Sequence, residues 1–280
     1  MYGAIIGDIT GSRLEFTRNR NPARVEVLPD DGFFTDDTAM TIAVASWLLK
    51  GGRLEAHIRR EYFYTAHLSY GARFRRWIWG EESGNSKGNG CIMRLGALPI
   101  MIGNRARENA LALEITNTTH RHPESLRAVT ALLQACHGQW HPGVLNWHPL
   151  SMRQLRRRHK WTELAEPSMR AVLSCVWNAN NFEEAIVNAC SIGGDADTLA
   201  AAAGTIAEQR FGVPSHLRQR VRGYLPHKYL EVIDEVYSRG TKLRHLGDSD
   251  HAASDGHDPG DARSAQDHRE EPSTLRALRR

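Results

Sequence analysis

The sequence lacks any long hydrophobic segment and any paired cysteine motif. No stretch approaches the roughly 18 uncharged apolar residues needed to span a bilayer, and the N-terminus has no basic segment followed by an apolar core. The four cysteines stand far apart in apolar segments, without a CxxC pair that would point to zinc or redox chemistry. We therefore expect buried free thiols and a cytoplasmic protein.

A strong excess of charge is also missing. The net charge is +4 over 280 residues, and lysine and arginine are scattered apart from one basic run at 153–158. A solvated helix face explains this run better than a nucleic-acid site does, although the second interpretation stays open. We expect no membrane partner, and nothing in the sequence requires a dimer, so we expect a monomer.

Strands are a third absence. Alternation of apolar and polar residues, typical of half-buried strands, does not occur in a convincing run. Apolar residues recur at helical spacing instead, which predicts an all-α fold with one compact domain at 1–239. From Gly240 onward polar residues dominate and aromatic residues almost disappear, so 240–280 is predicted to be a disordered charged tail. Helices are expected at 3–16, 37–50, 53–65, 72–79, 91–102, 106–118, 123–136, 150–158, 167–179, 182–191, 195–211, 215–222 and 227–238.

Small residues recur four apart in two of these expected helices. They are Gly3, Gly7 and Gly11 in the first helix and Ala196, Ala200 and Gly204 in the second. Each glycine costs roughly 1 kcal/mol of helix propensity, which favours a packing role, because a smooth stripe lets another helix approach closely. We predict that these two helices pack together at the centre of the fold. The alternative is that the glycine segment is partly loop.

Two segments carry clustered oxygen donors at expected helix starts. They read Thr35-Asp36-Asp37-Thr38 and Gly193-Gly194-Asp195-Ala196-Asp197-Thr198. Helix capping explains either segment alone, because a carboxylate is favourable at the positive end of the helix dipole. Mg²⁺ and Mn²⁺, however, prefer carboxylate and hydroxyl oxygens. Two such segments in one chain therefore favour a site for a pair of ions.

Four further features carry weaker signals. The Gly/Ser/Asn loop at 83–90 runs into an expected helix, where free backbone N–H groups favour an anion; a plain turn is equally compatible with it. His120 and His122 stand on a loop, where histidines are more often surface residues than ligands. Glu15 alone is typical of a surface residue. The segment 17–34 is a long loop, a kind that is often functional.

Taken in order, five motifs resemble the ADP-ribosylglycohydrolase family. They are Gly3-Ala4-Ile5-Ile6-Gly7-Asp8 with Gly11, Ser12 and Glu15; Phe34-Thr35-Asp36-Asp37-Thr38; Gly88-Asn89-Gly90 with Met93 and Arg94; Thr119-His120-Arg121-His122-Pro123; and Gly193-Gly194-Asp195-Ala196-Asp197-Thr198. The resemblance spans 1–238. It implies an all-helical, compact orthogonal bundle with a binuclear Mg²⁺ or Mn²⁺ centre at the base of a cleft that accepts ADP-ribose.

The resemblance also implies roles for individual residues. The two ions would be held by Thr35, Asp36, Asp37, Asp195, Asp197 and Thr198. The pyrophosphate and the adjoining ribose would be bound by Ser86, Gly88, Asn89 and Gly90, and His120 would line the ribose site. Glu15 matches an acidic residue near the metals, and the catalytic carboxylate would be Glu15, Asp37 or Asp195.

The implied activity is metal-dependent hydrolysis of the glycosidic bond between ADP-ribose and an acceptor, with arginine on a modified protein as the first expectation. O-linked, nucleic-acid-linked and small-molecule acceptors stay open, and so does a silent binding or structural relative. Two departures from the family leave the acceptor open. Cys91 and Ile92 stand where many members have small residues, and Lys87 lies inside the anion loop.

Overall fold

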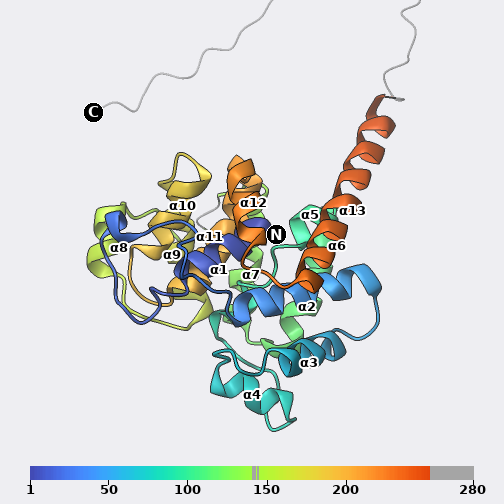
Figure 1. Ribbon diagram of the computed structural model, residues 1–280, viewed down its shortest axis with the longest axis horizontal. Helices are drawn as coiled ribbons and strands as arrows, with labels where there is room; N and C mark the ends of the chain where they lie inside the picture. Colours follow the sequence, from blue (N-terminus) through green and yellow to red (C-terminus); the bar gives the residue numbers. More distant parts are fainter. Residues whose placement is uncertain (141–142, 144, 253–280) are drawn as a thin grey trace, which may run out of the picture.

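Helices are the regular secondary structure of the described chain. The computed structural model describes residues 1–140, 143 and 145–252, and within them it contains no strand, only two isolated bridges (Figure 1). This confirms the all-α prediction. The α-helices are α1 Tyr2–Gly11, α2 Asp36–Lys50, α3 Leu54–Tyr64, α4 Ala72–Ile78, α5 Leu98–Met101, α6 Arg105–Thr119, α7 Pro123–Cys136, α8 Met152–Arg158, α9 Ala165–Trp177, α10 Phe182–Cys190, α11 Ala196–Phe211, α12 Ser215–Arg222 and α13 His227–Ala252, and the short 3₁₀ helices are Pro22–Arg24 and Asn89–Cys91.

The crossing of α1 and α11 lies at the centre of the molecule (Figure 1). At this crossing the backbones touch, because a methyl group on Gly204 would overlap the Gly3 carbonyl and one on Gly7 would overlap the Ala200 carbonyl. This close approach confirms the predicted packing through small residues. Helices α7, α9 and α10 pack around α11 from its other sides. All four cysteines are buried free thiols, as expected.

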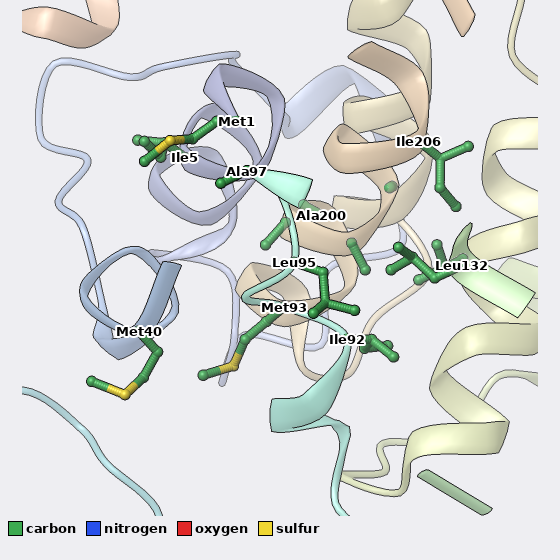
Figure 2. Close-up of a cluster of buried hydrophobic side chains, with 14 of the residues drawn as sticks. Met1, Ile5, Met40, Ile92, Met93, Leu95, Ala97, Leu132, Ala200 and Ile206 are labelled. Atoms are coloured by element: carbon green, nitrogen blue, oxygen red, sulfur yellow. The ribbon is translucent and has the colours of Figure 1, made fainter. Parts of the chain in front are cut away.

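The core continues from this crossing through the segment between Cys91 and α5. Figure 2 shows Ile92, Met93 and Leu95 of that segment between Met40 of α2 and Leu132 of α7. The expectation of one helix over 91–102 is wrong, because only Leu98–Met101 is α-helical. Pro99, near the start of α5, cannot donate a backbone hydrogen bond to the preceding turn, so the apolar run before it is a buried irregular segment.

Two other helix ends differ from the expected boundaries by more than two residues. α1 stops at Gly11 rather than at residue 16, because the Ser12 hydroxyl donates to the Ile9 carbonyl at 2.9 Å and tight turns follow. Glu15 therefore lies in a turn. α13 continues to Ala252, past the expected domain end at residue 239. Gly240 lies inside α13, where a methyl group would come within 2.5 Å of the Ile100 carbonyl oxygen. The expected tail from residue 253 on lies outside the described residues.

No helix in the described ranges has the length and apolar character needed to cross a membrane.

Candidate active site

The two acidic segments begin two helices whose N-termini meet. Thr35 caps α2 by accepting the Asp37 N–H at 3.2 Å, and Asp195 directly precedes α11. The C-terminal end of α1 lies against the start of α11, since a methyl group on Gly11 would lie 2.5 Å from Asp197 Cα. The positive ends of two helix dipoles therefore face the same cluster of carboxylates.

The turn after α1 brings a further carboxylate to this cluster. Oxygens of Glu15, Asp195 and Asp197 all lie within 4.8 Å of one another. Burial raises the pKa of Glu15 to about 7, and Asp195 is the next largest cause. Burial likewise raises the pKa of Asp36 to about 7, with Asp8 as the next cause. Ionised carboxylates at this spacing repel one another.

Two further carboxylates, deeply buried, also have raised pKa values. Burial first, and neighbouring carboxylates second, raise the pKa of Asp37 and of Asp197 well above the usual range. Asp37 is 3% exposed, and its Oδ2 has no hydrogen-bond partner within the described residues. An unpaired buried carboxylate oxygen is costly unless a ligand satisfies it. The donor set and this orphaned oxygen fit hard divalent cations.

A cavity of about 190 Å³ opens onto the carboxylates. The sequence-derived site residues that line it are Glu15, Asp36, Asp37, Ser86, Gly88, Asn89, Gly90, His120, Asp195, Asp197 and Thr198. Thr35 does not line it. Its hydroxyl is buried and donates to Asp8 Oδ1 at 2.7 Å.

Asp8 is a structural carboxylate that sequence reasoning did not assign to the site. It is fully buried in α1 and accepts four hydrogen bonds from the start of α2: from the Thr35 N–H at 3.0 Å, the Thr38 N–H at 3.1 Å and both threonine hydroxyls. It thereby fixes the end of α2 that carries Asp36 and Asp37. A charged residue inside an otherwise apolar, glycine-rich helix was the signal.

Replacement Asp8→Asn is expected to lower the free energy of unfolding by about 3 kcal/mol, because an amide N–H₂ would face donors where all four partners need an acceptor. Turnover should fall with it, since the start of α2 loses its anchor. Chemical denaturation and activity would measure both effects. Asp31→Asn, which removes an exposed partner of Arg13, is the matched control. Equal stability of the two variants would contradict the anchoring role.

The loop 86–90 is joined directly to the acidic cluster. Asn89 donates from Nδ2 to Asp195 Oδ2 at 2.6 Å, and its N–H donates to the Glu163 carbonyl at 2.7 Å. The Ser86 hydroxyl accepts the Gly88 N–H at 3.0 Å. The α-helix expected directly after this loop is not present, because Asn89–Cys91 is a single 3₁₀ turn, and the Gly88 and Asn89 N–H groups are bonded within the protein.

Part of the cavity wall comes from segments to which the sequence assigned no site role. Tyr70 and Phe74, whose rings stack at 5.3 Å between centroids, line it together with Arg73, and Glu163 lines it from the opposite segment. Nothing in the sequence spacing of the aromatic residues around α4 separates a cavity wall from a core. Glu163 arrives through the pairing of Gly88 with Leu164, a contact without a local sequence signal.

Of the two neighbouring histidines, one caps a helix and the other lines the cavity. His122 caps α7, since its Nδ1 accepts the Glu124 N–H at 3.2 Å. His120 is 7% exposed and lines the cavity. Burial, followed by the charges of Arg94 and Arg73, lowers the pKa of His120 well below its usual range, so this imidazole is neutral.

Known proteins share this sequence pattern and fold. A model of the ADP-ribosylglycohydrolase family matches residues 1–249. The chain is 26% identical over 295 residues to ADP-ribosylarginine hydrolase Tri1 of Pseudomonas putida (strain GB-1), covering 88% of this chain and 79% of that protein. It is 27% identical over 261 residues to the protein of the same name from Serratia proteamaculans (strain 568), covering 76% and 70%.

Among solved structures, a chain described as an ADP-ribosylglycohydrolase-related protein complex matches with a TM-score of 0.60 and 23% identity. The match covers 85% of this chain and 95% of that chain. At this identity the likeness establishes the shared fold.

Proposed function

The chain belongs to the ADP-ribosylglycohydrolase family and is therefore a glycosyl hydrolase; from this premise we propose that it releases ADP-ribose from modified arginine side chains of proteins in a reaction that requires divalent metal ions. The observation that carries the proposal is the buried carboxylate cluster with the orphaned Asp37 Oδ2 at the base of the cavity. Two curated relatives with the arginine activity in their names support the acceptor.

The residues that would hold two divalent cations are Asp36, Asp37, Asp195, Asp197 and Thr198, all of which line the cavity. Thr35, which the sequence placed among them, has its hydroxyl bonded to Asp8 instead. Such ions, when bound, neutralise the carboxylates and polarise oxygen ligands of the substrate. Asn89, bonded to Asp195, ties the position of the loop 86–90, here called the substrate loop, to that of the carboxylate cluster. The carboxylates stabilise the positive charge that develops on the ribose ring as the glycosidic bond breaks.

Hydrolysis joins a water oxygen to the ribose carbon C1″ and breaks the bond from this carbon to the guanidinium nitrogen, which takes up a proton. Glu15 is the proposed proton carrier, because it lies in a turn rather than inside a helix and is less buried than Asp37. Asp37 and Asp195 are the alternatives. Glu163, an exposed carboxylate on the cavity wall, adds negative charge that favours a cationic acceptor such as arginine.

Release of free ADP-ribose tests the function. Arginine-ADP-ribosylated and serine-ADP-ribosylated proteins would be incubated with the enzyme in Mg²⁺, in Mn²⁺ and in EDTA. We expect metal-dependent release from the arginine substrate. Release from the serine substrate alone would move the acceptor to O-linked ADP-ribose, and binding of ADP-ribose without any release would indicate a silent relative.

Metal removal should also destabilise the protein. Ions that bind the folded cluster at 100 times their Kd contribute about 2.7 kcal/mol, and for a chain of this size that corresponds to roughly 5–10 °C in Tm. Thermal melts in excess Mn²⁺ and in excess EDTA would measure the difference. A Tm that EDTA leaves unchanged would contradict a metal centre built from these residues.

A further inference from the structure

A buried chain of hydrogen bonds joins Arg94 to His120, and both residues line the cavity. Arg94 is 1% exposed, and its Nη2 donates to Thr119 Oγ1 at 2.6 Å and to the Ile115 carbonyl at 3.1 Å. Thr119 Oγ1 lies 2.6 Å from His120 Nδ1. Arg94 has no carboxylate partner in the described ranges, and its Nε is buried and unpaired. A buried arginine without a counter-charge is unusual for a purely structural residue.

The direction of the hydrogen bond between Thr119 and His120 follows from the donors and acceptors around the Thr119 hydroxyl. An arginine can only donate, so Thr119 Oγ1 accepts from Arg94 and keeps one hydrogen to give. Thr116 and Thr118 of the same helix donate to the carbonyls four residues earlier. The corresponding carbonyl for Thr119, that of Ile115, receives Arg94 instead, and within the described part of the chain the Thr119 hydroxyl is bonded only to Arg94 and His120. The Thr119 hydroxyl therefore donates to His120 Nδ1, because otherwise its hydrogen would be buried without an acceptor.

A neutral imidazole that accepts at Nδ1 carries its hydrogen on Nε2. His120 Nε2 faces the substrate loop, since a methyl group built on Gly90 would lie 3.4 Å from it and one on Gly88 3.7 Å. No described residue forms a hydrogen bond to this nitrogen. Its N–H is thus free to meet a ligand in the cavity.

We propose that Arg94 and Thr119 are positioning residues that lock His120 in its Nε2–H tautomer, so that His120 donates a hydrogen bond to an oxygen of the ADP-ribose diphosphate or of the adjoining ribose. The ligand in this proposal rests on the proposed function. The tautomer does not, because it belongs to the free protein. In this relay of hydrogen bonds, Arg94 donates to the Thr119 hydroxyl, the Thr119 hydroxyl donates to His120, and His120 contacts the ligand.

NMR spectroscopy can determine the tautomer of His120 directly. In protein labelled with ¹⁵N-histidine, long-range proton–nitrogen correlation spectra distinguish Nε2–H from Nδ1–H imidazoles, and a His120→Gln sample assigns the signal. The wild-type protein should show Nε2–H. Thr119→Val, which keeps the shape of the side chain and removes its hydroxyl, should lose this preference and weaken ADP-ribose binding roughly tenfold. Thr119→Ser should restore both the tautomer and the affinity.

An Nδ1–H signal in the wild-type protein would overturn the proposal, and so would a Thr119→Val protein with unchanged tautomer and affinity. A structural role for Thr119 alone would lower stability without moving the tautomer signal. Failure of the proposed function has a different signature: the wild-type tautomer is Nε2–H, yet ADP-ribose does not bind or no ADP-ribosyl bond is cleaved. That outcome leaves the relay intact and removes its ligand.

Discussion

An Asp37→Asn enzyme is expected to turn over an arginine-linked substrate about 10³-fold more slowly than wild type, because it loses the buried carboxylate oxygen that we propose as a metal ligand. Asp37 is the most constrained member of the cluster. It follows the N-cap of α2, its Oδ2 is buried without a partner, and the other carboxylates surround it. An amide in its place is a poorer cation ligand and carries no charge.

The same substitution should have the opposite effect on the metal-free fold. Neutralising one buried carboxylate removes repulsion from its neighbours, so in EDTA the Tm of Asp37→Asn should equal or exceed that of wild type. In Mn²⁺ the order should reverse, since the variant gains less from the ion. Turnover, calorimetric Mn²⁺ titration and paired melts would measure the three effects.

Asp30→Asn is the matched control for this variant, because the Asp30 side chain is 99% exposed and pairs with Arg220 away from the cavity. It should keep wild-type turnover and Mn²⁺ binding. A folded Asp37→Asn enzyme with wild-type turnover would show that the chemistry is not centred on this carboxylate cluster.

The sequence was sufficient to predict the central features because they are local or repeat at a helical period. Glycines four apart can only form a smooth face on a helix, and α1 uses that face against α11. The acidic residues that the sequence places at helix starts are also at helix starts in the structure. The crossing brings the starts of α2 and α11 together. The all-α fold class follows from the same periodicity.

The parts of the site that the sequence did not predict depend on contacts between segments that are far apart in the chain. Glu163 reaches the cavity only because Gly88 pairs with Leu164, and Tyr70 lines it only because the turn before α4 folds back toward α2. Hydropathy also cannot distinguish a buried irregular segment from a helix. The run after Cys91 is as apolar as a core helix, and its conformation is limited by Pro99 and by packing against α1.

The largest effect on stability is expected at the crossing of α1 and α11. Gly7→Ala should lower the free energy of unfolding by at least about 3 kcal/mol, because the new methyl group would overlap the Ala200 carbonyl and lie 2.6 Å from Ala201 N. These are backbone atoms of a helix packed on several sides, so they cannot move aside as a flexible side chain would. In an isolated helix the same change would stabilise by about 1 kcal/mol, which makes the sign itself informative.

Gly103→Ala is the control for this prediction, since no heavy atom lies within 4 Å of the position that its methyl group would take. It should unfold at nearly the wild-type denaturant concentration, whereas Gly7→Ala should unfold earlier or fail to fold. Because this crossing places Gly11 against the start of α11, a folded Gly7→Ala protein should also bind Mn²⁺ more weakly. Wild-type stability in Gly7→Ala would mean that the two helices can separate without cost, and the site geometry derived from their crossing would fail with it.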